Sequence, residues 1–260
     1  MKVVLLAGGL GTRISEESEM RPKPMIEIGG MPILWHIMKE YSWYGHNDFI
    51  ICAGYKHYMV KKWFADYHFY TSDISVDFRE DNGVTVINKK AEPWTVKIID
   101  TGFLTNTGGR IKKVQNYIGD EPFFMTYGDG VCDVDISDLL KFHQEHGKTA
   151  TLTAVEQKEQ KGLIDMAYDN SVRCFREKSV RDNVYINAGY MVFEPEIFDR
   201  LDEDTVLETT VLSALAEEGA LMSYRHNGFW QCMDTLKEKK YLEDIIAHGN
   251  APWMRWERTG

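Results

Sequence analysis

Glycines and two basic residues follow the first apolar run of the chain. Residues 3–7 lead directly into Gly8-Gly9-Leu10-Gly11-Thr12-Arg13, and Lys23 stands between two prolines a little further on. A strand that ends in glycines exposes backbone N–H groups at the carboxyl edge of a sheet, where α/β proteins bind phosphates. Arg13 and Lys23 would add a guanidinium and an ammonium group at that edge. The pattern predicts a phosphate-binding loop.

Two better-known phosphate loops do not fit these residues. The dinucleotide fingerprint GxGxxG would need a glycine where Ile14 stands, and the Walker A loop would need Gly-Lys-Ser/Thr, which the sequence lacks here.

The elements that must position this loop alternate between strands and helices. Strands are predicted over 3–7, 48–54, 123–129, 150–155 and 185–193, and helices over 33–44, 56–67 and 136–146, the last capped by Asp135. This alternation predicts an α/β fold with a mainly parallel sheet and crossover helices. Because no Pro/Ser/Gly-rich linker interrupts the chain, we expect one domain over 1–260 with a substrate-facing second half.

Composition excludes several classes of protein. The 260 residues carry 40 acidic and 30 basic side chains, a net charge of -10. Non-specific binding to nucleic acid or to an anionic membrane is therefore not expected, because both depend on a broad basic surface. The four cysteines have no metal-ligand or disulfide spacing and are predicted to be buried free thiols. No apolar run is long enough for a signal segment or a membrane span, so a cytoplasmic location is expected.

Longer motifs give a specific resemblance. LLAGGLGTR at 5–13 and RPKPMIEIGGMPIL at 21–34 resemble the signature of the sugar-phosphate nucleotidylyltransferases. The motifs at 92–110, 123–136 and 226–243 resemble the glucose-1-phosphate cytidylyltransferase branch of that family. The likeness covers nearly the whole chain. It implies the nucleotide-diphospho-sugar transferase fold, a Rossmann-like, mainly parallel mixed sheet flanked by helices. It also implies a nucleotide-binding part over about 1–135 and an acceptor-binding part over about 136–260.

The reaction that this resemblance implies joins CTP to a phosphorylated acceptor, most simply glucose 1-phosphate, and releases pyrophosphate. Since a phosphate monoester is already an anionic nucleophile near neutral pH, catalysis would come from positioning and charge neutralisation. Arg13 and Lys23 are the expected catalytic pair, because they can stabilise negative charge on the leaving pyrophosphate.

A triphosphate and a sugar phosphate in one site also call for a divalent cation. The resemblance implies Asp129 and Asp234 as the ligands of Mg2+. The alternatives are a turn-forming role for Asp129 and an N-cap role for Asp234. Asp133 and Asp135 are expected to be solvated or to cap a helix.

The nucleotide is expected to contact the glycine loop and a second glycine motif. The residues concerned are Leu6, Ala7, Gly8, Gly9, Gly11, Thr12, Thr107, Gly108 and Arg110. Small residues let backbone groups approach a base closely. Arg110 could bind the nucleotide phosphates, contact the base edge, or form a surface salt bridge, and the sequence does not separate these.

For the acceptor, Glu177, Lys178 and Asn187 resemble the family's sugar and phosphate contacts. Two departures lie nearby: Ser179 follows Lys178 where the family has proline, and Gln160-Lys161-Gly162-Leu163-Ile164-Asp165 replaces an Arg-Phe-Gly stretch. Another sugar phosphate, or a phosphorylated amide or polyol, therefore stays open as the acceptor. A catalytically silent binding or regulatory subunit is the alternative from another class.

Remaining polar and aromatic clusters are assigned structural roles. His36 and Glu40 are predicted to pair on a helix surface, and His143 and His146 to lie at a solvated helix end. The resemblance implies a homo-oligomer, with a hexamer as the expected form, and the aromatic segment 63–70 is a candidate contact surface.

Overall fold

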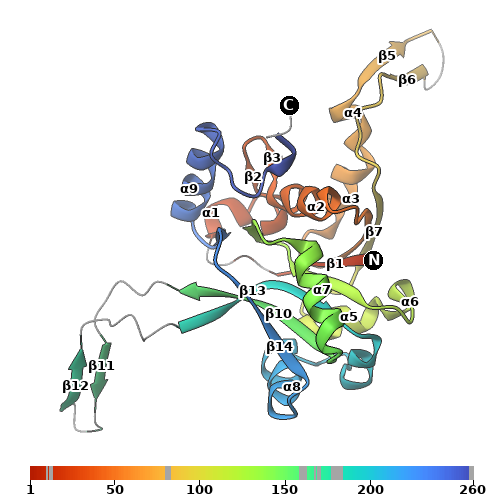
Figure 1. Cartoon of the computed structure of the whole chain (residues 1–260). Coiled ribbons are helices and arrows are strands. Elements are labelled where there is room, and N and C mark those ends of the chain that lie inside the picture. Colours follow the sequence, from red (N-terminus) through yellow and green to blue (C-terminus); the bar gives the residue numbers. More distant parts are fainter. Residues whose placement is uncertain are drawn as a thin grey trace.

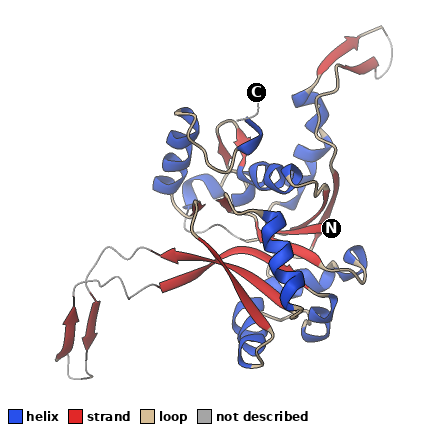
Figure 2. Cartoon of the chain, in the orientation of Figure 1, coloured by secondary structure: helices blue, strands red, loops and turns tan. Residues whose placement is uncertain are grey.

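A seven-stranded sheet forms the centre of the molecule, with helices on both of its faces (Figures 1 and 2). The computed structural model describes residues 1–9, 11, 14–79, 83–157, 163–166, 168, 171–176 and 184–257. In spatial order the strands are β14 (Leu221–His226), β10 (Ala150–Gln157), β13 (Val184–Phe193), β8 (Phe123–Tyr127), β1 (Lys2–Ala7), β4 (Asp48–Ala53) and β7 (Thr95–Asp100).

The sheet is mainly parallel, as predicted. Only β13 runs against its neighbours, since it pairs antiparallel with both β10 and β8. The other pairs, β1 with β4 and β8, β4 with β7, and β10 with β14, are parallel. The edge strand β7 was not among the predicted strands.

The continuous apolar run of β1 explains its central place. Val3, Leu5 and Ala7 face one hydrophobic core, and Val4 and Leu6 face the other. A strand buried on both faces needs apolar residues at every position rather than at alternate ones. The first core is covered by α2 (Ile33–Trp43), α3 (His57–Ala65), α7 (Ile136–His146) and α9 (Leu236–Ala247); the second is covered by α5 (Thr107–Lys113), α6 (Gln115–Ile118), η3 (Pro195–Arg200), η4 (Leu207–Leu212) and α8 (Ser213–Glu217).

Short elements complete the described chain. They are α1 (Ser15–Ser18), η2 (Lys23–Met25), α4 (Tyr67–Thr71), η5 (Arg255–Glu257), and the two-stranded pairs β2 (Glu27–Ile28) with β3 (Met31–Pro32), β5 (Asp73–Asp77) with β6 (Gly83–Ile87), β9 (Gly130–Cys132) with β15 (Trp230–Cys232), and β11 (Leu163–Met166) with β12 (Val172–Arg176). No helix in the described part of the chain is long and apolar enough to span a membrane.

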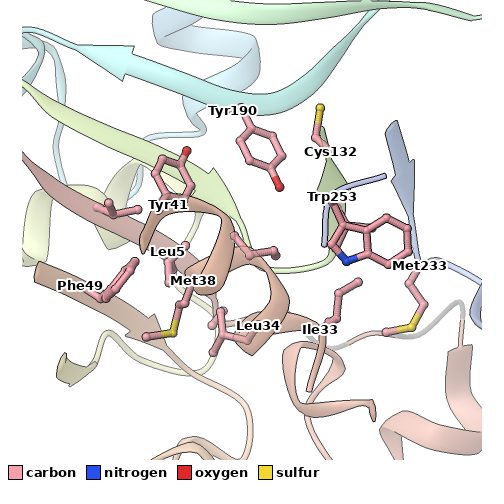
Figure 3. Packing of buried hydrophobic residues seen from close by; sticks show 14 of the residues in the cluster. Leu5, Ile33, Leu34, Met38, Tyr41, Phe49, Cys132, Tyr190, Met233 and Trp253 are labelled. Atoms are coloured by element: carbon pink, nitrogen blue, oxygen red, sulfur yellow. The ribbon is translucent and has the colours of Figure 1, made fainter. Parts of the chain in front are cut away.

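The predicted surface pair on α2 is wrong, because both side chains are buried. His36 and Glu40 are each 1% exposed. His36 Nε2 lies 2.9 Å from the Ile28 carbonyl oxygen, and the Tyr190 hydroxyl lies 2.9 Å from Glu40 Oε2. The C-terminal segment covers this face of the helix: Trp253 is fully buried among the core residues shown in Figure 3. The polar residues of α2 were assigned to a solvent-exposed face because the segment that covers this face is distant in the sequence and the local pattern does not reveal it.

The helix α7 fits its prediction at its start and departs from it at its end. Asp135 caps the helix by accepting from the Asp138 backbone amide at 3.0 Å, as expected. His143, however, is buried rather than solvated. Its ring nitrogens lie 2.7 Å from Thr151 Oγ1 and 3.1 Å from Glu194 Oε1, so β10 and the residue that follows β13 supply its partners.

Candidate active site

A pocket of about 320 Å3 lies beyond the carboxyl ends of β1 and β8. Open α/β sheets bind ligands at this edge, where strand ends and loops converge. The lining combines the end of β1, the lysine of η2, the start of α5, the turn after β8 and the start of η4. Its residues are Leu6, Gly8, Gly9, Lys23, Pro24, Thr105, Asn106, Thr107, Arg110, Tyr127, Gly128, Asp129, Val206 and Glu208.

Two carboxylates meet the ammonium group of Lys23 at this pocket. Lys23 Nζ lies 2.6 Å from Asp129 Oδ2 and 2.5 Å from Asp234 Oδ1. The lysine is 8% exposed, in the turn between Pro22 and Pro24 that forms η2. Three residues from distant parts of the chain thus form one charged group.

The β9–β15 pair brings the two aspartates together. Asp129 directly precedes β9, Asp234 follows β15 by two residues, and the Met233 amide donates to the Asp129 carbonyl at 2.8 Å. Thr235, not Asp234, caps α9, because the Thr235 hydroxyl accepts from the Glu238 amide. The N-cap role considered for Asp234 is therefore not the one that the structure shows.

The two carboxylates explain why Lys23 stays protonated. Burial by itself would lower the pKa of the lysine, but Asp129 and Asp234 outweigh it and raise the pKa above its ordinary value. The lysine therefore stays charged. One positive and two negative groups leave the cluster net negative, which would repel a triphosphate unless another cation were present.

The donor set of the pocket fits a hard divalent cation that is shared with a substrate. No group of three or more His, Cys, Asp or Glu side chains in the described ranges could hold a metal alone. Asp129 and Asp234 nevertheless come within reach of a single cationic atom, Lys23 Nζ. Mg2+ is often bound by one or two carboxylates together with substrate phosphates, so two aspartates suit it.

Arg110 points into a cage of backbone carbonyls. Its guanidinium lies 2.7 Å from Thr101 Oγ1, 2.8 Å from the Gly102 carbonyl and 3.0 Å from the Gly8 carbonyl. It is 5% exposed, so it is not a surface salt bridge. The Arg110 side chain thus connects the end of β1 to the segment after β7, and these hydrogen bonds hold the start of the glycine loop in place. A guanidinium suits this place because its donors fan out in one plane.

Glu208 and Tyr127 are pocket residues that the sequence analysis did not identify. Glu208 accepts hydrogen bonds from the Tyr127 hydroxyl at 2.5 Å and from Thr107 Oγ1 at 2.6 Å. Thr107 Oγ1 in turn accepts from the Leu207 amide. Glu208 lies in η4, a π-helical turn, and such turns occur often at functional sites. The only sequence signal for Tyr127 was its place two residues before Asp129.

The Asn187-Ala188-Gly189 segment of β13 lies against Tyr127. Asn187 Oδ1 accepts from the Gly189 amide at 2.8 Å, and the Asn187 side chain also hydrogen-bonds to Tyr127. Gly189 has φ +84°, and a Cβ there would lie 2.4 Å from the Tyr127 ring. Glycine is required at 189 by both its backbone angle and this close approach. The segment thus reaches the pocket through Tyr127.

The remaining predicted residues differ in their relation to the pocket. Leu6, Gly8, Gly9 and Thr107 line it, whereas Ala7 is buried in the core beneath it. Gly11 has φ +65°, and its carbonyl accepts from Ser18 Oγ at 2.9 Å. Gly108 packs against Thr205 and Leu201 instead of facing the pocket. Thr12, Arg13, Glu177, Lys178 and Ser179, and residues 160–162 of the departing stretch, lie outside the described residues.

Comparison with known proteins identifies close sequence relatives. A family model described as nucleotidyl transferase matches residues 2–244. The glucose-1-phosphate cytidylyltransferase of Salmonella typhimurium is 51% identical over 259 residues, which cover 99% of this chain and 100% of that protein. The probable glucose-1-phosphate cytidylyltransferase of Bacillus subtilis is 40% identical, and the match covers 98% of this chain and 100% of that one.

Solved structures share the fold at lower identity. A UDP-glucose pyrophosphorylase superposes with a TM-score of 0.69 and 17% identity, covering 95% of this chain and 98% of that one. HddC from Yersinia pseudotuberculosis superposes with a TM-score of 0.63 and 23% identity, covering 94% and 99%.

Proposed function

This chain belongs to the nucleotidyl transferase family, and we propose that it transfers the cytidylyl group of CTP to glucose 1-phosphate, giving CDP-glucose and pyrophosphate. The identity of 51% over the full length of a glucose-1-phosphate cytidylyltransferase supports the choice of nucleotide and acceptor. The main structural support for this reaction is the position of Lys23 between Asp129 and Asp234 in the pocket at the end of β1.

The reaction forms and breaks one phosphorus–oxygen bond. A phosphate oxygen of glucose 1-phosphate attacks the α-phosphorus of CTP, and the bond from that phosphorus to the bridging oxygen breaks. The electron pair leaves with pyrophosphate, so no proton has to be transferred. Negative charge grows on the leaving group, and a fixed ammonium group next to it lowers the barrier. Lys23 supplies that group, with Arg13 as its proposed partner from the glycine loop.

A divalent metal would be held by Asp129 and Asp234. Enzymes of this family generally use one, and we propose Mg2+. When bound, the metal neutralises phosphate charge. The two aspartates, one before β9 and one after β15, would hold it, and Lys23, already charged, would lie beside them to bind phosphate oxygens.

The nucleoside and the sugar are assigned to opposite parts of the pocket. We infer that the cytosine lies against Leu6, Gly8, Gly9 and residues 105–107, which line the pocket and where glycine leaves backbone groups accessible. The sugar phosphate is assigned to the side formed by Tyr127 and Asn187, with Glu177 and Lys178 as further contacts proposed from the sequence.

We also propose that the protein assembles with copies of itself, as a hexamer, through the β5–β6 hairpin. This hairpin stands away from the sheet in Figure 1. Ile74 pairs with Val86 and Val76 with Val84, so four apolar side chains share one face. An isolated two-stranded hairpin is marginally stable in water, so this face needs a partner. Light scattering should report a hexamer that Val76→Glu weakens, while Thr85→Glu, on the opposite face, leaves it intact.

The activity is tested by pyrophosphate release from the purified protein with Mg2+. CTP with glucose 1-phosphate is expected to react fastest in a panel that includes UTP, dTTP and other phosphorylated sugars, amides and polyols. Faster turnover with UTP or dTTP would refute the choice of base. Faster turnover with another acceptor would replace glucose 1-phosphate, and release from no nucleotide would mean a silent subunit.

A further inference from the structure

A buried polar chain lies directly behind the aspartate turn, and the chemistry above does not use it. Glu40 of α2 is 1% exposed and Tyr190 of β13 is fully buried. The Tyr190 hydroxyl oxygen lies 2.9 Å from Glu40 Oε2 and 3.1 Å from the carbonyl oxygen of Gly130. Gly130 is the first residue of β9 and follows Asp129 in the sequence.

The register of β9 shows why the Gly130 carbonyl needs this partner. The Met233 amide donates to the Asp129 carbonyl, and the Asp133 amide donates to the Phe229 carbonyl. Because hydrogen-bonded and non-hydrogen-bonded pairs alternate in an antiparallel ladder, Gly130 opposite Cys232 is a non-hydrogen-bonded pair. Its carbonyl therefore points away from β15, into the core. Tyr190 satisfies a buried acceptor that the sheet cannot reach.

The number of available protons limits how these groups can bond. Tyrosine has one hydroxyl proton, so it cannot donate to Glu40 and to Gly130 together. Both contacts are satisfied when the Glu40 carboxyl carries a proton and donates it to the Tyr190 oxygen. An ionised Glu40 would instead accept a hydrogen bond from the Tyr190 hydroxyl. The Tyr190 oxygen and the Gly130 carbonyl oxygen would then face each other with no proton between them.

We propose that Glu40 and Tyr190 are positioning residues: a protonated Glu40 donates to Tyr190, and Tyr190 donates to the Gly130 carbonyl, which fixes the backbone that carries Asp129. Two successive carbonyls are then anchored from opposite sides, that of Asp129 by Met233 and that of Gly130 by Tyr190. The inference rests on the metal role proposed for Asp129.

The surroundings of Glu40 agree with a neutral carboxyl group. Burial raises its pKa well above the ordinary value. The titratable and charged groups that face it are Tyr190 of β13, Tyr41 and Tyr44 at α2, Cys132 and Asp133 at β9, and Arg255 of η5. Arg255 and the Cys132 backbone amide favour the charged form, but burial outweighs them. Among the described residues no group meets hydrogen-bond geometry at Glu40 Oε1, so a full negative charge would be poorly solvated.

Figure 3 shows Tyr190 beside Tyr41 and Cys132, and Tyr41 offers a matched control. The Tyr41 ring stacks on Tyr190, and its buried hydroxyl bonds to Thr126 Oγ1 instead of to β9. Removing either hydroxyl takes one oxygen atom from the same core. Only the loss at Tyr190 leaves the Gly130 carbonyl without its donor.

The test measures Mn2+ binding by electron paramagnetic resonance, without substrates, for Tyr190→Phe, Glu40→Met, Glu40→Gln and Tyr41→Phe. Loss of a group that orients a metal ligand costs roughly 10- to 100-fold in affinity. Tyr190→Phe and Glu40→Met should show this loss. Glu40→Gln should bind nearly as wild type, since its amide can donate to Tyr190, and Tyr41→Phe should be unchanged. Equal affinities of Tyr190→Phe and Tyr41→Phe would overturn the proposal.

A second readout does not depend on the metal. The infrared spectrum of the wild-type protein should contain the carbonyl band of a protonated carboxyl group, and Glu40→Gln should lack it. A wild-type spectrum without that band would overturn the proposal that a protonated Glu40 donates to Tyr190. If the wild-type protein binds no Mn2+, that result counts against the metal role of Asp129. The infrared band still tests whether Glu40 is protonated and can donate to Tyr190.

Discussion

Lys23 and Asp234 are 211 positions apart in the sequence, and their side chains meet at 2.5 Å. The contact joins the N-terminal glycine-loop region to the segment after β15. Because Asp129 reaches the same ammonium group from the turn after β8, the pocket depends on three distant segments being folded together.

Replacing Lys23 by Met should reduce turnover more than CTP binding. The ammonium group lies where charge develops on the leaving pyrophosphate, and loss of one such group costs about 10²- to 10³-fold in kcat. Steady-state pyrophosphate release gives kcat and KM for CTP separately. Lys97→Met is the control, because Lys97 pairs with Asp48 at the other end of the sheet. A Lys23 variant with normal kcat would contradict the assigned role.

Asp234→Asn should raise the Mg2+ concentration needed for half-maximal activity by at least about tenfold, the lower range for disturbed metal sites. The amide keeps the shape of the side chain and removes the charge that would hold the cation. A titration of Mg2+ at saturating CTP measures the shift. Asp204→Asn, in an exposed turn, provides the comparison. Unchanged activity at limiting Mg2+ would exclude Asp234 as a ligand.

Arg110→Lys should destabilise the fold as well as weaken CTP binding. Lysine keeps the charge but cannot reach the Gly8 carbonyl, the Gly102 carbonyl and Thr101 together, and each buried acceptor left unpaired costs about 1–3 kcal/mol. Urea unfolding and the KM for CTP are the two measurements. If Arg110 acted only as a phosphate contact, KM would rise while the free energy of unfolding stayed the same.

Gly189→Ala and Gly219→Ala form a matched pair. Both glycines have positive φ, +84° and +68°, but a Cβ at 189 meets the Tyr127 ring at 2.4 Å while a Cβ at 219 meets nothing within 4 Å. Both variants should lose about 1 kcal/mol of stability from backbone strain. Only Gly189→Ala should also raise the KM for the sugar phosphate. An equal KM in both variants would remove Tyr127 from the acceptor side.

His36 should contribute a loss of stability in mild acid, and this contribution is read from the difference between the wild-type protein and His36→Gln. Buried Glu40, whose pKa is raised, contributes in the opposite sense over the same pH range. Burial lowers the pKa of His36 from 6.5 to about 4. Between these values the unfolded chain binds a proton at this histidine that the native protein does not, so its contribution to the free energy of unfolding falls as pH decreases, by about 3 kcal/mol in total. Urea unfolding from pH 7 to 4 measures the slope. His36→Gln should remove the contribution of His36 from the slope. It leaves that of Glu40, that of His46, whose pKa is also lowered to about 4, and those of His143 and His146, whose pKa values are lowered by burial.

Local sequence determined five of the seven strands of the central sheet as predicted ranges, three of the helices, and several residues of the pocket, but not the edge strand β7. An apolar run as short as residues 3–7, followed at once by glycines, indicates a strand buried on both faces, and the structure shows β1 in that position. Lys23 was predicted from its place between two prolines close to the glycine loop, and Asp129 from the resemblance of its motif to the family.

Tertiary structure decided what each polar side chain meets. Arg110 faces carbonyls because the ends of β1 and β7 converge around it, and Glu208 enters the pocket because η4 packs beside Thr107. His36 and Glu40 looked like a surface pair, since spacing i, i+4 places two residues on one helix face without showing what covers it. The C-terminal Trp253 and the strand residue Tyr190 cover that face. Burial depends on distant segments, so the sequence pattern predicted much of the central secondary structure, whereas the contacts of the polar side chains were decided by the fold.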